Sequence, residues 1–426
     1  MKKTIQDILI VGFALFSMLF GAGNVIFPPY LGLGCGPQWM QGFLFYYIAD
    51  IGLALTCLFA IQRCGGHRAI TGHLGKHCSE LLICVITLCI GPMVAIPRTA
   101  ASTFEMSILP LFPQWDPVLF SILFFILVIL LCINENSVID IIGKLLTPLL
   151  IAGLLVLIIK GTVHPIGQIS NTVLVSNVPV TGINAGYQTM DVLAMVIFGT
   201  LISRSVRSKG YIRRSQQNRI ILGSGLIAGV SLLVIYLGLA YLGATAGSLF
   251  DLGVDHTFLI TSIVHLLLGQ AGTVLFSVVV ALACLTTAVA LVSSCSAYFS
   301  TLSKGKISYF WIVCVICGSS AFVTTFGLNQ IISIAAPILD IIYPPTLLVI
   351  LLSFFDRWID NDWVYRLGAL GALLYSIMNI LNSYGAPFSF LRELPLYSYG
   401  FGWTSPALLC AVCGLLLPSK KKKRSE

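Results

Sequence analysis

The sequence has 426 residues, of which 57% are hydrophobic and only 9% are Asp, Glu, Lys or Arg. About a quarter of the residues in a soluble domain are charged, because its surface must face water. This composition excludes a soluble globular protein and predicts one all-α unit embedded in a membrane. The formal net charge is +8. Its Lys and Arg gather in short clusters between apolar stretches, and no nucleic-acid-binding motif is present, so nucleic acid is not an expected partner.

Twelve apolar stretches are predicted to be transmembrane helices, since each is long enough to cross a hydrocarbon core of about 30 Å. The stretch at 255–270 is predicted to be a helical outer loop, and the uncharged segment at 161–185 a polar outer loop. In chain order the predicted spans are residues 7–33, 38–61, 79–109, 117–133, 139–160, 186–203, 220–242, 272–302, 309–326, 331–355, 364–381 and 402–417.

The placement of basic residues predicts the topology. With the N-terminus in the cytoplasm, almost all of the 24 Lys and Arg fall in or beside cytoplasmic segments, including the loop at 204–219 and the tail at 420–424. Basic loops stay on the cytoplasmic side of a membrane. The sequence therefore predicts a multi-pass protein with both termini in the cytoplasm.

Three predicted spans contain a sequence that should interrupt a helix. They are Gly-Ala-Gly-Asn at 21–24, followed by two prolines; Gly-Pro at 91–92; and Phe-Gly-Thr at 198–200, with Gly186 and Tyr187 at the outer end of that span. At 1.5 Å per helical residue, each interruption lies roughly 20 Å from one end of its span. Irregular backbone at this depth is tolerated only where it lines a cavity or packs within protein. Single glycines also serve close helix packing, but the convergence favours a transporter site.

Freed backbone amides at such interruptions suit a substrate carboxylate, and freed carbonyls suit a cation or an ammonium group. A charge at the bilayer centre costs at least about 2.5 kcal/mol, so deep charges are functional candidates. Asp191 is expected to face the transport pathway, whereas Arg98, Glu105 and Asp340 are expected to form structural pairs. Arg98 could pair with Glu105 or with an acid on another span. The predicted substrate-binding residues are Gly21, Ala22, Gly23, Asn24, Tyr187, Asp191, Phe198 and Gly199.

The eighth span contains Ala-Cys-Leu-Thr-Thr at 283–287. The hydroxyls of Thr286 and Thr287 and the carbonyl of Ala283 offer neutral oxygens on one side of a helix, and a hard cation such as sodium takes oxygen ligands. Alternatively, each threonine bonds a carbonyl of its own helix. The sequence therefore offers a candidate sodium site.

These motifs resemble the bacterial branched-chain amino acid transport system II carrier family, the branched-chain amino acid:cation symporters. The resemblance runs from about residue 13 to the basic tail, and rests on the segments 20–29, 91–100, 186–191, 198–199, 282–288 and 336–344. It implies import of leucine, isoleucine and valine with sodium across the bacterial inner membrane. It also implies that the carbonyls of Ser17 and Phe20 complete the ion site with Ala283, Thr286 and Thr287.

The resemblance further implies a leucine-transporter-like 5+5 inverted repeat. The two repeats would span about 7–160 and 186–355, with two additional helices at 364–417, in a single transmembrane domain. A proton-coupled symporter of neutral amino acids that uses Asp191 or Asp50 is the alternative. No Walker sequence or His-Glu-x-x-His appears, so neither an enzyme, an ATPase subunit nor a cofactor is expected. The expected partners are the amino acid, sodium and lipid.

Overall fold

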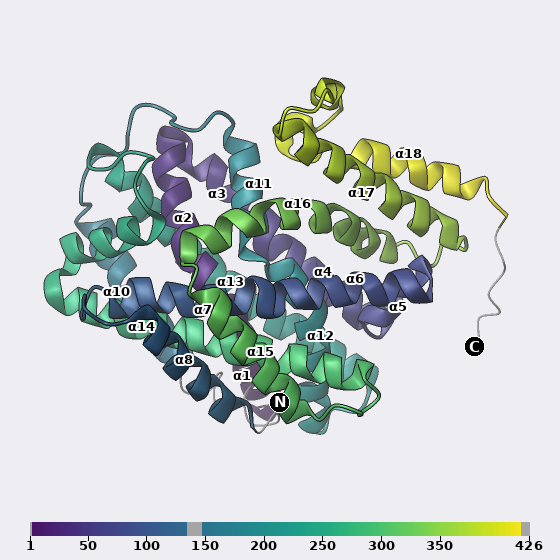
Figure 1. The fold of residues 1–426 in the computed structure, drawn as a ribbon, viewed down its shortest axis with the longest axis horizontal. Helices are drawn as coiled ribbons and strands as arrows, with labels where there is room; N and C mark the ends of the chain where they lie inside the picture. Colours follow the sequence, from purple (N-terminus) through teal and green to yellow (C-terminus); the bar gives the residue numbers. More distant parts are fainter. Residues whose placement is uncertain (1, 134–146, 419–426) are drawn as a thin grey trace.

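The computed structural model describes residues 2–133 and 147–418. In these residues every regular element is helical, as Figure 1 shows. The start of the fifth predicted span, at 139–146, and the basic tail at 420–424 lie outside them. The α-helices are α1 (Lys2–Leu19), α2 (Ala22–Cys35), α3 (Trp39–Tyr47), α4 (Leu53–Cys64), α5 (His67–Thr71), α6 (Lys76–Leu88), α7 (Ala95–Thr103), α8 (Pro117–Cys132), α10 (Thr147–Val163), α11 (Val178–Thr189), α12 (Asp191–Ser208), α13 (Arg214–Thr245), α14 (His256–Leu302), α15 (Tyr309–Thr324), α16 (Leu328–Ser353), α17 (Asp362–Ser383) and α18 (Thr404–Leu415).

Within the described residues, each predicted span overlaps one of these helices or two consecutive helices. In the described part of the chain, seven helical stretches are long and apolar enough to cross a membrane: Ala22–Cys64, Lys76–Ile108, Val178–Ser208, Arg214–Ser248, His256–Leu302, Leu328–Ser353 and Asp362–Ser383. Four shorter apolar helices accompany them: Pro117–Cys132, Leu150–Val163, Tyr309–Thr324 and Thr404–Leu415. The prediction of an all-α polytopic membrane protein is therefore confirmed.

The long helix α14 bends at Gly269, whose φ of 62° and ψ of −155° are not helical. The bend separates residues 256–268 from the apolar part of α14 that follows. The Asp255 side chain caps this first part by accepting hydrogen bonds from the backbone of Thr257 and Phe258. The helical segment predicted at 255–270 is thus present, joined end to end with the eighth span.

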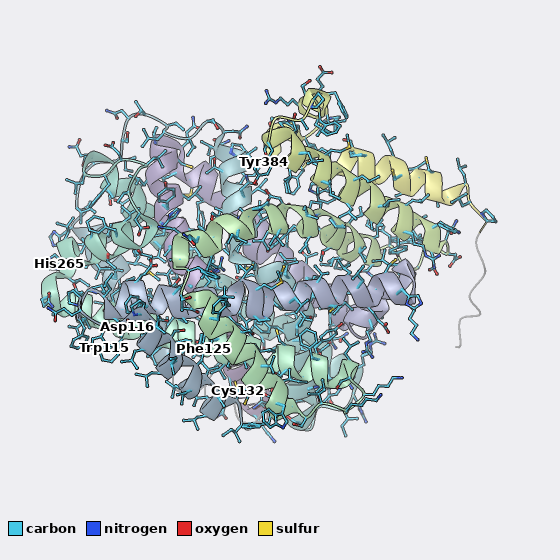
Figure 2. The ribbon with its side chains drawn as sticks, viewed as in Figure 1. Trp115, Asp116, Phe125, Cys132, His265 and Tyr384 are labelled. Carbon is cyan, nitrogen blue, oxygen red and sulfur yellow. The ribbon has the colours of Figure 1, made fainter. Side chains whose placement is uncertain are left out.

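The outward face of α8 carries the residues expected of a surface in contact with lipid. Figure 2 labels Trp115 and Asp116 at the start of α8, and the buried Phe125 and Cys132 farther along the helix. Asp116 caps the helix by accepting from the Leu119 amide at 2.8 Å. One stripe of α8 is apolar and exposed, formed by Val118, Leu119, Ile122, Leu123, Ile126, Leu127 and Leu130. Lipid tails can cover such a stripe, because the helix satisfies its own backbone groups.

The interior of the bundle is centred on α2, in which every residue except Tyr30 is buried. Pro28 and Pro29 lie inside α2 and do not interrupt it. Helix α13 crosses α2 so closely that a Cβ atom added to Gly243 would lie 1.8 Å from the Pro29 carbonyl oxygen. By contrast, α17 and α18 pack against each other at one edge of the molecule, at the upper right of Figure 1.

Gly243→Ala should destabilise the protein, because its methyl group would force α13 away from the backbone of α2. Overpacking of this kind typically costs about 1–3 kcal/mol. The matched control is Gly318→Ala in α15, where an added Cβ atom meets no atom within 4 Å. The higher helix propensity of alanine should stabilise that helix by up to about 1 kcal/mol. The melting temperature of the purified protein should fall for the first variant only. Equal melting temperatures would contradict this account of the crossing.

Candidate functional site

Two helix interruptions bring four helix ends together inside the bundle. The first lies between α1 and α2, where Gly21 is extended, with φ −109° and ψ −165°. The second lies between α11 and α12, where Met190 takes a left-handed conformation, with φ 68° and ψ 15°. Residues from both interruptions line one small cavity. Backbone amides at the starts of α2 and α12 and carbonyls at the ends of α1 and α11 therefore meet near it, as broken helices do in transporters.

The predicted position of the second interruption was wrong. The sequence placed it at 198–200, but Gly199 lies within the continuous helix α12. A Cβ atom on Gly199 would lie 2.8 Å from Cδ1 of Ile61, so this glycine allows two helices to approach closely. The span begins at Val178 rather than at Gly186, since the Asn177 side chain caps α11 and Pro179 occupies its first turn. An Asn-x-Pro sequence is a recognisable helix start.

The other two predicted interruptions are confirmed. Helix α1 ends at Leu19 and α2 begins at Ala22. In the third span, Gly91 departs from helical geometry, with φ −87° and ψ −126°, inside the π-helical turn Cys89–Met93 between α6 and α7. Ile90, at this turn, lines the same cavity as residues from the other two interruptions. Three breaks from distant parts of the sequence therefore converge.

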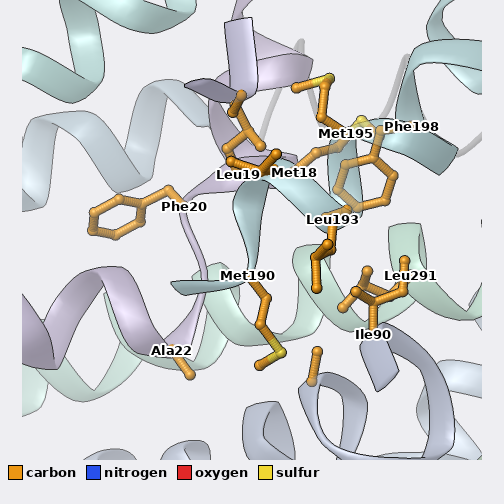
Figure 3. Close-up of a cluster of buried hydrophobic side chains, with 14 of the residues drawn as sticks. Met18, Leu19, Phe20, Ala22, Ile90, Met190, Leu193, Met195, Phe198 and Leu291 are labelled. Carbon is orange, nitrogen blue, oxygen red and sulfur yellow. The ribbon is translucent and has the colours of Figure 1, made fainter. Parts of the chain in front are cut away.

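The cavity has a volume of about 20 Å³, which is room for about one water molecule. Figure 3 shows the apolar side chains that gather around it, among them Met18, Ile90, Met190, Phe198 and Leu291. Its polar boundary is formed by Asn24, Arg98, Thr99, Thr189, Asp191 and Thr287. An apolar wall with a few polar groups on one side is the usual lining of a small-molecule site.

Five of the predicted substrate-binding residues line this cavity: Gly21, Ala22, Asn24, Asp191 and Phe198. Gly23 lies beside it, and a Cβ there would be 3.0 Å from Nη2 of Arg98. Tyr187 and Gly199 are outside the lining. The Tyr187 ring stacks on Tyr343 with centroids 4.4 Å apart, and Gly199 packs on α4. Both residues were expected at the site because the interruption was expected at 198–200, whereas the structure has it at Met190.

Asn24 is the centre of a buried polar network. Its Nδ2 atom donates to Asp191 Oδ2 at 2.9 Å and lies 3.4 Å from Asp50 Oδ2 and within hydrogen-bond distance of the Tyr236 hydroxyl. Its Oδ1 atom accepts from the Gly21 amide at 3.4 Å. The Thr189 hydroxyl donates to Asp50 Oδ1 at 2.8 Å. One side chain thus joins both interruptions to two buried carboxyl groups.

Of the two pairings expected as possible for Arg98, the one with Glu105 is absent. Nη1 and Nη2 of Arg98 donate to the carbonyls of Gln188 and Thr189, the latter at 3.0 Å. The Glu105 carboxylate accepts from the Leu328 amide at 3.1 Å and from the Thr257 hydroxyl at 3.2 Å. Seven residues separate the two side chains in sequence, but the break at Gly91 and the π-helical turn Phe104–Ile108 leave them bonded to different neighbours.

The predicted ion-binding residues lie together at the contact between α1 and α14. Ser17 Oγ lies 3.0 Å from Thr286 Oγ1, which donates to the Ala283 carbonyl at 2.9 Å. Thr287 Oγ1 is 3.2 Å from the Ser17 carbonyl oxygen and 3.3 Å from that of Phe20. All of these hydrogen bonds are buried. Thr286 thus bonds a carbonyl of its own helix, as the alternative expected, whereas Thr287 bonds across to the end of α1. Three carbonyl and two threonine hydroxyl oxygens therefore lie close together in the interior.

Sequence reasoning missed Met190 and Tyr236. A left-handed non-glycine residue has no simple sequence signature, and the apolar stretch around Tyr236 does not distinguish this tyrosine from others in the spans. Asp50 was recognised as a deep charge, but its connection to Asp191 through Asn24 depends on three separate spans. A π-helical turn, Ile48–Gly52, carries Asp50, and such turns often occur at functional sites.

Comparison with known proteins identifies the family. The family model described as branched-chain amino acid transport protein matches residues 4–421. The chain belongs to this family. It is 33% identical to the branched-chain amino acid permease BraB of Bacillus subtilis (strain 168) over 442 aligned positions, covering 98% of each chain. It is 34% identical to a putative branched-chain amino acid carrier protein of Staphylococcus aureus (strain USA300), covering 96% of each.

Solved structures identify the fold of this branched-chain amino acid transport family member. Mhp1, a nucleobase-cation-symport-1 family transporter in a closed conformation, superposes with a TM-score of 0.63 at 13% identity, over 96% of this chain and 92% of that one. A Na⁺-coupled sialic acid symporter has a TM-score of 0.54 at 13% identity, over 99% and 98%. The family member thus has the leucine-transporter fold; it is a multi-pass membrane transporter and not an enzyme.

Asn24→Leu should destabilise the folded protein, because Asp191 and Tyr236 would stay buried without the hydrogen bonds that they share with the Asn24 amide. An unsatisfied buried polar group costs about 1–3 kcal/mol. Asn329→Leu is the matched control, since the Asn329 amide also donates to a carboxylate, Asp255, at 2.9 Å but in an exposed position. Thermal unfolding in detergent should show a clear fall in melting temperature for Asn24→Leu and little change for the control. An unchanged melting temperature for both would mean that the network contributes little to stability.

Proposed function

We propose that this protein is a secondary active transporter that imports leucine, isoleucine and valine by symport with sodium. Membership of the branched-chain amino acid transport protein family supports the substrate class. The observation that carries sodium coupling is the buried group of neutral oxygens from Ser17, Phe20, Ala283, Thr286 and Thr287 beside a helix interruption. The Na⁺-coupled sialic acid symporter of the same fold is consistent with this coupling ion.

The proposed substrate site is the cavity between the two interruptions. The free amides of Ala22, Gly23 and Asn24 in the first turn of α2 face the carboxylate, because a helix start attracts negative charge. Asp191 attracts the ammonium group. Phe198 and the neighbouring apolar side chains enclose the branched side chain, where each buried methylene contributes about 0.8 kcal/mol. Tyr187 and Gly199 have no part in this site.

Loading an amino acid requires more than the 20 Å³ of the cavity. We therefore propose that the apolar wall of Figure 3 moves when the site is open to one side of the membrane. The interruptions at Gly21 and Met190 are natural places for such movement, since few hydrogen bonds join the two halves of each broken helix. These interruptions occupy corresponding positions if the second repeat begins with α11 at Val178 rather than at 186. The proposed repeats then span about 7–160 and 178–355, with α17 and α18 outside them.

The proposed orientation places both termini in the cytoplasm of a bacterial cell, with the protein in the inner membrane. Basic residues from α5, α12 and the start of α13 gather around two adjoining hollows: Arg68, Arg204, Arg207 and Arg214. Arg214 donates to the carbonyl of Arg63 at 2.6 Å, which joins the start of α13 to the end of α4. A concentration of positive charge at one end of the bundle is the arrangement expected of a cytoplasmic face.

Replacing either threonine hydroxyl should raise the sodium concentration needed for half-maximal leucine uptake. Thr286→Val and Thr287→Val keep the side-chain volume but remove a ligand, so a shift of about tenfold, equal to roughly 1.4 kcal/mol, is expected for each. Thr286→Ser and Thr287→Ser should shift the curve little. Thr301→Val is the control in the same helix, since its hydroxyl bonds the Ala297 carbonyl at an exposed position.

The measurement is labelled leucine uptake into proteoliposomes against sodium concentration, at fixed pH. Unchanged curves for both valine variants would place the ion elsewhere. Equal uptake with and without sodium in the wild-type protein would exclude sodium symport altogether.

The second candidate function is proton-coupled symport of neutral amino acids, and it is favoured by the pair Asp50 and Asp191. Both carboxyl groups are buried and both lie within hydrogen-bond distance of the same Asn24 nitrogen. Two adjacent buried carboxyl groups do not both ionise readily, because their negative charges repel each other. One of the two is therefore expected to keep a proton. A proton gained on one side and released on the other would couple transport to the proton gradient.

The two coupling ions predict opposite results when the proton gradient is removed. With a sodium gradient imposed and a proton uncoupler added, we expect uptake of leucine to persist. Asp50→Asn should then retain a sodium dependence similar to that of the wild-type protein, although its rate falls. Loss of uptake with the uncoupler, while the sodium gradient is unchanged, would favour the proton.

A further inference from the structure

Arg98 has hydrogen-bonding capacity that the protein itself does not use. The side chain extends from α7 to the cavity and is 4% exposed. A guanidinium group has five N–H donors. The carbonyls of Gln188 and Thr189 accept from its two terminal nitrogens. Its Nε is buried and has no hydrogen-bond partner among the described residues.

No carboxylate in residues 2–133 or 147–418 forms an ion pair with Arg98. Glu105 is bonded to the Leu328 amide and the Thr257 hydroxyl. Asp50 and Asp191 accept from Asn24, and Asp50 also from Thr189. The ring centroid of Phe27 lies 5.9 Å from Cζ of Arg98. Because a buried cation is normally paired with an anion, the unused donors of Arg98 are available to an anionic group that enters the cavity.

The start of α2 lies directly against this guanidinium. A Cβ atom on Gly23 would be 3.0 Å from Nη2 of Arg98 and 3.3 Å from Cζ. Glycine at this position therefore lets the side chain approach the first turn of α2, whose amides have no acceptor within their own helix. One negatively charged group placed here would meet a cation and a helix start together.

We propose that Arg98 binds the α-carboxylate of the transported amino acid, together with the amides at the start of α2. The planar N–H edge of arginine matches the two oxygens of a carboxylate. Asp191, on the lining of the same cavity, receives the ammonium group. The site therefore selects a zwitterion by its two charged ends, while the apolar wall selects the side chain. This assignment rests on the proposed function.

The assignment also gives Arg98 a part in the response to substrate. Its terminal nitrogens hold the carbonyls that end α11, just before the interruption at Met190. A carboxylate bound by Arg98 thus connects α7 and the start of α2 with the end of α11. Binding of the substrate carboxylate would in this way favour the arrangement in which both broken helices close on the cavity.

The test compares ligands that differ only at the carboxylate. Leucine and leucinamide share the side chain and the amino group, but leucinamide carries a neutral amide in place of the carboxylate. Inhibition of labelled leucine uptake, or ligand-induced stabilisation of the purified protein, gives the affinity ratio between them. The variants are Arg98→Gln, Arg98→Lys and Gly23→Ala. Arg392→Gln is the control, because this arginine is exposed in the 3-10 helix Ser389–Glu393.

In the wild-type protein and Arg392→Gln, leucine should bind at least about tenfold more tightly than leucinamide, since a charge-assisted bidentate pair is lost. Arg98→Gln should bring this affinity ratio close to one, chiefly by weakening the binding of leucine. Arg98→Lys should give an intermediate ratio, because lysine keeps the charge without the fork. Gly23→Ala should lower the ratio by displacing the guanidinium from the start of α2.

Each other outcome overturns the assignment. A wild-type ratio in Arg98→Gln would mean that the α2 amides hold the carboxylate alone. An equal loss of affinity for both ligands would mean that Arg98 only supports the structure. If Arg98→Gln does not fold, wild-type ratios in both Arg98→Lys and Gly23→Ala overturn it. Failure of the wild-type protein to bind or transport leucine would instead remove the proposed function, and the assignment with it.

Discussion

The need to satisfy backbone hydrogen bonds away from water governs the whole structure. A broken helix inside a bilayer leaves amides and carbonyls that lipid cannot bond. Here side chains supply partners at both interruptions: Arg98 bonds the carbonyls that end α11, and Thr287 lies within reach of the carbonyls that end α1. The groups that stabilise the breaks are thus also the groups that bound the cavity. A ligand that enters can exchange places with these internal hydrogen bonds.

The two proposed binding sites share the interruption between α1 and α2. The Phe20 carbonyl faces Thr287, whereas the adjacent Gly21 lines the cavity, and a Cβ atom on Gly21 would lie 3.1 Å from Cγ2 of Thr287. An ion that draws Phe20 and Thr287 together would therefore fix the start of α2, where the carboxylate is proposed to bind. Sites joined in this way affect each other's affinity reciprocally, which is the thermodynamic requirement of symport.

Charge balance at the cavity involves one arginine and two carboxyl groups, with Asn24 between the carboxyls. A zwitterion adds one charge of each sign and leaves the total unchanged, so it can be taken from water without adding a net charge to a region of low dielectric. The outward surface of the bundle, by contrast, is apolar along α8. Helices α17 and α18 lie at the edge of the bundle (Figure 1) and contribute no residue to the lining of the cavity.

The sequence by itself determined the class of protein, the helical spans and the first and third interruptions. These depend on local properties: long apolar stretches partition into lipid, and Gly-Ala-Gly-Asn or Gly-Pro disfavours a helix wherever it occurs. Residue type and spacing also indicated Thr286 and Thr287 as oxygen ligands on one side of a helix. The tertiary structure decided the second interruption at Met190, the bonding of Arg98 to carbonyls rather than to Glu105, and the link between Asp50 and Asp191 through Asn24. These depend on groups that meet only when distant helices pack, and no local pattern encodes such meetings.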